Sequence, residues 1–209
     1  MPQFLIDGPT KGPVYLFAHG SGVGMGSDFM SEMASGLAAR GVRSARFEFA
    51  YMAARRTGGS KRPPPRTPVL EVEFIEAIDA MKSEGALFIG GKSMGGRIAS
   101  MIAEDLFAQT KVAGLICLGY PFHPTGQPEK LRVDHLKELS LPTLICQGER
   151  DPFGTAEDVA RYGLPDRISL KWLKDGDHGF KPRKASGLTL AQNMDQAIEA
   201  ITKFIAAHS

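Results

Sequence analysis

Short runs of apolar residues, bounded by glycine or proline, alternate along the chain with longer stretches in which apolar residues recur at helical spacing. The short runs are rich in aliphatic and aromatic residues, which is typical of buried strands. They are Val14 to Ala18, Val42 to Phe49, Ala86 to Ile89, Val112 to Leu118, Thr143 to Gln147 and Ile168 to Trp172. The helical stretches are Phe29 to Ala39, Val69 to Ser83, Met94 to Ala108 and Leu190 to Ala207. This alternation predicts a mostly parallel central sheet with crossover helices on both faces.

No internal repeat and no linker divides the chain. At 209 residues it is long enough to bury a large core without staples, so we expect one domain over residues 1–209. Lys and Arg number 25 against 23 Asp and Glu, and a net charge of +2 favours neither nucleic acid nor an anionic membrane. Cys117 and Cys146 lie in apolar runs with no Cys/His cluster nearby, so we expect buried free thiols and no metal site.

The N-terminal residues show no targeting signal, because Asp7 interrupts a short apolar patch that no basic stretch precedes. The longest apolar runs are far shorter than the roughly 18 residues of a membrane span. We therefore expect a cytoplasmic protein that does not bind membranes.

The segment GGKSMGGR, residues 90 to 97, follows a predicted strand and precedes a predicted helix. A phosphate-binding loop of the form G-x-x-x-x-G-K-[ST] would need glycine where the chain has Ala86. The pattern G-x-S-x-G is met by Gly91, Ser93 and Gly95, and on a sharp strand-to-helix turn it exposes the serine hydroxyl as a nucleophile. A simpler interpretation makes Ser93 a helix cap. A nucleophilic serine needs a histidine base and an orienting carboxylate, so the presence of these partners decides between the two interpretations.

Both partners are found after later strands. Asp151 follows the strand Thr143 to Gln147 in the turn GERDPFG, and Glu149 is the alternative acid. His178 follows the strand Ile168 to Trp172 in the loop DGDHGF. The order serine, aspartate, histidine, with each residue at the carboxyl end of a strand, is that of the α/β-hydrolases.

A third glycine-rich segment, residues 17 to 26 (FAHGSGVGMG), follows the strand Val14 to Ala18. The dinucleotide pattern G-x-G-x-x-G fails there in every register, so we expect no bound cofactor. In a hydrolase this loop supplies a backbone N–H that stabilises the oxyanion, together with the N–H after the nucleophile. Ser21 and Met94 are the candidate donors, and His19 is expected to shape the loop rather than act as a base.

Residues 50 to 69 depart from the pattern, with five basic residues, no acidic residue and three consecutive prolines. We predict a loop, because such a run of prolines excludes a helix interior and a central strand. The preceding strand, Val42 to Phe49, should end at the same sheet edge as Ser93. Arg55, Arg56 and Arg62 are therefore candidates to bind an anionic or polar substrate, and a solvated charge run is the alternative.

Taken together, these motifs resemble a small lidless α/β-hydrolase of the group that includes testis-expressed protein 30 and the third subunit of the NSL histone-acetyltransferase complex. The resemblance rests on FAHGSGVGM, RFEFAYM, GGSKRPPPR, GGKSMGGR, GERDPFG and DGDHGF. More distantly, the chain is similar to dienelactone-hydrolase-like proteins, which commonly have cysteine where this chain has Ser93. The resemblance implies Ser93 as nucleophile, Asp151 as acid and His178 as base. Because only Gly119 to Leu141 occupy the usual place of a lid, we expect one short helix there, near Glu129 to Glu138.

The sequence therefore predicts a carboxylesterase-like serine hydrolase that cleaves an ester, thioester or similar acyl bond of a small-molecule substrate through an acyl-enzyme. Acyl transfer to another acceptor would use the same residues. An interaction module on the same fold, without catalysis, is the alternative of another class.

Overall fold

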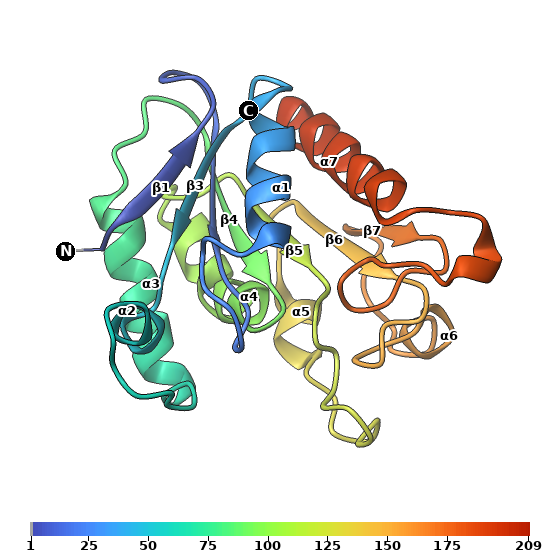
Figure 1. The fold of residues 1–209 in the computed structure, drawn as a ribbon. Coiled ribbons are helices and arrows are strands. Elements are labelled where there is room, and N and C mark those ends of the chain that lie inside the picture. The colour runs from blue at the N-terminus through green and yellow to red at the C-terminus, as the bar shows by residue number, and fades with distance from the viewer. Residues whose placement is uncertain (1) are drawn as a thin grey trace.

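A seven-stranded sheet forms the centre of the computed structural model, which describes residues 2–209 (Figure 1). Its strand order is β1-β3-β2-β4-β5-β6-β7, and only β1 runs antiparallel to its neighbour. The strands are β1 (Phe4–Asp7), β2 (Val14–Ala18), β3 (Arg43–Phe47), β4 (Leu87–Lys92), β5 (Gly114–Leu118), β6 (Thr143–Gly148) and β7 (Ile168–Leu173). Because β2 to β7 are parallel, the loops after their carboxyl ends meet at one edge of the sheet.

Helices cover both faces of this sheet. On one face α1 (Asp28–Ala38) packs against α7 (Leu190–Ala207), as Figure 1 shows, and on the other α3 (Thr67–Ala80) packs against α4 (Met94–Ala108). Three shorter helices lie in connections: α2 (Ala50–Arg56), α5 (Asp134–Glu138) and α6 (Ala156–Val159). A single 3₁₀ turn, Lys184–Ser186, precedes α7.

Strands β2 and β4 to β7 contribute side chains to both hydrophobic cores, because successive residues of a strand point to opposite faces. In β2, Val14, Leu16 and Ala18 pack under α3 and α4, whereas Tyr15 and Phe17 pack under α1 and α7. All five are fully buried. The near-continuous apolar runs of the sequence are thus central parallel strands, which confirms the predicted α/β-hydrolase fold.

Two of the predicted connections are wrong in part. The segment predicted as a loop over residues 50 to 69 begins with α2, because Ala50–Arg56 consists mostly of strong helix formers and the proline run starts only at Pro63. The short helix expected near Glu129 to Glu138 covers only Asp134–Glu138. It is the one helix between β5 and β6, so nothing of lid size covers the sheet edge within the described residues.

Strand β1 was not predicted. Leu5 and Ile6 are 39% and 47% exposed, so its pattern lacks a buried face. An ion pair from Asp7 Oδ2 to the mostly buried Arg46 Nη2 of β3, 2.7 Å long, joins this edge strand to the sheet. None of the helices in residues 2–209 has both the length and the apolarity needed to cross a bilayer.

Candidate active site

Ser93 occupies the sharp turn between β4 and α4. Its backbone has φ +52° and ψ −114°, a left-handed region that costs a non-glycine residue about 1–3 kcal/mol. The Ser93 N–H donates to Leu118 O at 2.9 Å, which holds the turn against the end of β5. A Cβ on Gly95 would lie 2.5 Å from Ala18 O, and one on Gly91 would lie 2.4 Å from the same oxygen. The turn therefore needs both glycines because β2 passes directly beside it.

Asp151 lies after β6 and is fully buried. Its Oδ1 accepts a hydrogen bond from the N–H of Phe153 at 2.9 Å. Its Oδ2 accepts from His178 Nδ1 at 2.8 Å and from Gln147 Nε2 at 3.0 Å. These donors hold one carboxylate oxygen toward the imidazole ring.

Gln147 is the part of this arrangement that sequence reasoning missed. Its buried amide accepts from Tyr120 N–H at 2.7 Å and donates to Tyr120 O, Gly154 O and Asp151 Oδ2 at 3.0 to 3.2 Å. The amide thus joins the loop after β5 to the loop that carries Asp151. The only signal in the sequence is a polar residue near the end of an otherwise apolar strand.

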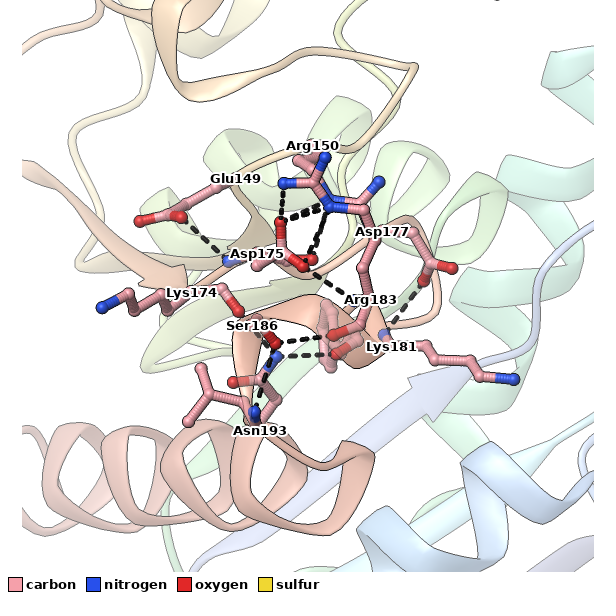
Figure 2. A network of polar contacts seen from close by, with 11 residues as sticks. Glu149, Arg150, Lys174, Asp175, Asp177, Lys181, Arg183, Ser186 and Asn193 are labelled. Carbon is pink, nitrogen blue, oxygen red and sulfur yellow. Dashed lines mark hydrogen bonds and ion pairs between the residues drawn. The ribbon is translucent and has the colours of Figure 1, made fainter.

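His178 lies in the loop after β7, and contacts on the far side of that loop fix its shape. Arg150 and Arg183 converge on the Asp175 carboxylate, as Figure 2 shows, with Nε contacts of 2.9 Å to Oδ1. The hydrogen bond from Arg183 is the main cause that lowers the pKa of Asp175. Glu149 accepts from the Asp175 N–H at 2.8 Å, so the alternative acid faces this network and the carboxylate on His178 is that of Asp151.

The imidazole of His178 is 27% exposed and packs on the ring of Phe153, with 4.5 Å between centroids. Because Asp151 occupies Nδ1, Nε2 is the nitrogen left to exchange a proton with a nucleophile. The loop and the serine turn are directly connected, since Lys92 Nζ, one residue before Ser93, donates to His178 O at 2.6 Å.

The loop after β2 approaches the serine from the other side. A Cβ on Gly20 would lie 3.7 Å from Ser93 Cβ. His19 is buried; its Nε2 accepts from Phe49 N–H at 3.2 Å and its Nδ1 lies 2.7 Å from Gly20 O. Burial lowers the pKa of His19, so this ring is neutral at pH 7 and holds the loop in shape.

The two expected oxyanion donors, Ser21 and Met94, directly follow Gly20 and Ser93, the two residues that lie close together. Met94 is the first residue of α4, where an N–H has no partner within the helix. Ser21 follows Gly20, and its carbonyl oxygen accepts from Tyr51 Oη at 3.1 Å. The N–H groups of Ser21 and Met94 thus belong to two segments that adjoin Ser93.

The three candidate arginines have different surroundings. Arg55 Nη1 donates to Gly22 O at 3.3 Å, in the loop of the expected oxyanion donors. Arg56 pairs with the carboxylate of Glu48 at 2.8 Å, and that side chain is only 5% exposed. Arg62 Nε donates to Ser60 Oγ, at 3.4 Å, and makes no ion pair within residues 2–209. Arg55 and Arg62 therefore remain available to an anion, whereas Arg56 is already paired.

The two cysteine thiols are shielded. Cys117 and Cys146 are both buried and free, and burial raises the pKa of Cys146 to about 12 and that of Cys117 further. Within residues 2–209, no three His, Cys, Asp or Glu side chains are grouped as metal ligands would be.

A mostly parallel sheet with a serine at the turn after β4 and an Asp–His pair at the same edge defines the α/β-hydrolase class. Residues 11–206 match the family described as an alpha/beta hydrolase domain, and the chain belongs to that family.

Solved structures of the same class resemble it over nearly their whole length. Est1E from Butyrivibrio proteoclasticus matches at a TM-score of 0.71 and 16% identity, over 97% of this chain and 94% of that one. The monoacylglycerol lipase of Paleococcus ferrophilus matches at 0.70 and 14%, over 100% of both chains. XC6422 from Xanthomonas campestris, described as a serine hydrolase without lid, matches at 0.66 and 17%, over 96% and 88%. At these identities the likeness establishes the fold.

Proposed function

We propose that this chain is a carboxylesterase-like serine hydrolase in which Ser93 is the nucleophile, His178 the base and Asp151 the orienting acid. The observation that carries the proposal is the 2.8 Å hydrogen bond from His178 Nδ1 to buried Asp151, in a loop bonded to the residue before Ser93. Membership of the alpha/beta hydrolase family supports hydrolysis as the reaction class.

The chemistry follows from these roles. His178 Nε2 takes the proton of Ser93 as the serine oxygen attacks the acyl carbon, and the N–H groups of Ser21 and Met94 stabilise the oxyanion. When the tetrahedral intermediate collapses, the imidazolium gives its proton to the leaving oxygen or sulfur. Water then attacks the acyl-enzyme by the same route and releases the acid. None of these steps uses a metal or an organic cofactor.

We propose that one domain, residues 1–209, carries this activity. Within the family, the six motifs support a narrower relation to the group that includes testis-expressed protein 30 and the third subunit of the NSL complex. The substrate is a small acyl compound, and Arg55 and Arg62 favour an anionic or polar group on it. The position of Arg55 beside Gly22 supports that selection.

Labelling with a fluorophosphonate probe tests the nucleophile. The wild-type protein should be labelled at one serine, and Ser93→Ala should abolish labelling without unfolding the chain. Ser100→Ala is a matched control, because Ser100 Oγ also contacts a histidine, His135 Nε2, at 2.9 Å. Ser100 is only 1% exposed and should not react.

The outcomes separate the candidate functions. Labelling that persists in Ser93→Ala would refute the assignment. A wild-type protein that is folded and is never labelled would favour an interaction module on this fold.

A further inference from the structure

Lys92 is a charged residue in a place where charge is rarely found. It ends β4, one residue before Ser93, and is only 9% exposed. Its Nζ lies over two aromatic rings, 5.3 Å from the centroid of Phe29 and 5.8 Å from that of Phe180, at cation–π distance. Its ammonium donates a hydrogen bond to His178 O, at 2.6 Å.

The ammonium also lies close to the imidazole of His178. A Cβ on Gly119 would be 2.7 Å from Lys92 Nζ and 3.3 Å from His178 Cε1. Lys92 Nζ and His178 Cε1 therefore both lie close to this one position, and so close to each other. A charge within about 6 Å of a titratable ring changes its protonation. The other charged groups that act on Lys92 are the carboxylates of Asp151 and Asp177.

A purely structural explanation does not account for this arrangement. Burial lowers the pKa of Lys92 to about 8, so the folded protein is destabilised by keeping the charge at pH 7. An apolar side chain such as methionine would fill similar space without that penalty. Compared with methionine, lysine provides a hydrogen-bond donor and a positive charge, and both lie beside His178.

We propose that Lys92 is a positioning residue for His178: its hydrogen bond to the histidine carbonyl sets the imidazole relative to Ser93, and its charge favours the neutral imidazole that can accept the serine proton. This inference rests on the proposed function. One atom, Lys92 Nζ, performs both roles. Lys92 ends β4 directly before Ser93, so both residues lie at the same edge of the sheet.

Lys92→Met tests both roles. We expect kcat for p-nitrophenyl acetate and the rate of fluorophosphonate labelling to fall by about 10- to 100-fold, with KM nearly unchanged, because small displacements of a base cost rate. We also expect the acidic limb of the kcat/KM profile to move upward, since the ammonium that repels the imidazolium has been removed. Lys174→Met is the matched control, because it removes an exposed lysine whose side chain points away from the network in Figure 2.

A variant that keeps the neutral donor separates the two roles. Lys92→Gln should recover part of the loss in kcat while keeping the shifted limb, and it carries the same pH test if Lys92→Met does not fold. Wild-type rates with an unmoved limb would overturn the inference. So would a loss of rate that parallels a loss of melting temperature with no change in the limb. Failure of the wild-type protein to react with the probe would instead refute the proposed function.

Discussion

The buried ammonium of Lys92 predicts an unusual dependence of stability on pH. Its pKa is lowered from 10.5 to about 8 in the folded protein, whereas in the unfolded chain water restores the ordinary value. Between these pH values the unfolded chain binds a proton that the folded protein lacks, so the free energy of unfolding rises with pH. Each pKa unit is worth about 1.4 kcal/mol, which makes the full effect about 3 kcal/mol. The penalty is complete below pH 8 and gone above pH 10.5.

Comparison with Lys92→Met isolates this effect, because the other titrating groups are common to both proteins. At pH 7 the variant escapes the penalty but leaves His178 O without its donor, which costs about 1–3 kcal/mol. We therefore expect its free energy of unfolding to equal or exceed that of the wild type by up to about 2 kcal/mol. Near pH 10.5 only the lost hydrogen bond remains, and the wild type should be the more stable protein.

Urea unfolding followed by the fluorescence of the single tryptophan, Trp172, measures this difference. A change of about 3 kcal/mol corresponds to a shift of roughly 1 M or more in the urea midpoint. Lys174→Met should show no such dependence, because its ammonium is exposed in both states. A stability difference between Lys92→Met and wild type that stays constant from pH 7 to 10.5 would contradict this prediction, since it would mean that the ammonium keeps its hydration on folding.

Three further results are expected at the same edge of the sheet. Asp151→Asn should lower kcat on the order of 10⁴-fold, whereas Glu149→Gln should have a far smaller effect; the opposite ranking, measured with one ester, would move the acid to Glu149. Gln147→Leu should lower the free energy of unfolding by about 2–4 kcal/mol, because buried partners of its amide lose their hydrogen bonds; an unchanged urea midpoint would contradict this. Replacing Arg55 and Arg62 by glutamine should raise KM for a carboxylate-bearing ester and leave KM for a neutral ester of equal size unchanged. The rise in KM should be smaller at high salt. Equal effects on both esters would mean that these arginines are surface charges without a role in substrate selection.

The fold was predictable because its signals are local. Apolar runs such as Val14 to Ala18 are continuous only when both faces of a strand are covered, which requires a parallel sheet under helices. The positions of Ser93, Asp151 and His178 followed from the same rule, because residues just after parallel strands share one edge. Glycine on both sides of Ser93 marked the turn, and the close approach of β2 gives the physical reason.

The remaining features depend on contacts between distant segments. Lys92 and His178 are 86 residues apart, and nothing near Lys92 in the sequence distinguishes a buried ammonium from a solvated one. The role of Gln147 is equally hard to predict, since its partner Tyr120 lies in the loop after β5, the strand beside β6. Strand β1 is an exposed edge joined to β3 by backbone pairing and by the Asp7–Arg46 ion pair. The prolines that follow α2 hid that helix from sequence-based prediction.

Motion at the site is constrained by the ion pair between Arg150 and Asp175. Arg150 directly precedes Asp151, and Asp175 belongs to the loop of His178, so the pair joins the same two loops as the Asp151–His178 hydrogen bond. A displacement of one loop toward or away from the serine carries the other with it. Because Lys92 also joins the His178 loop to the serine turn, acid, base and serine are held together by side-chain contacts as well as by the sheet.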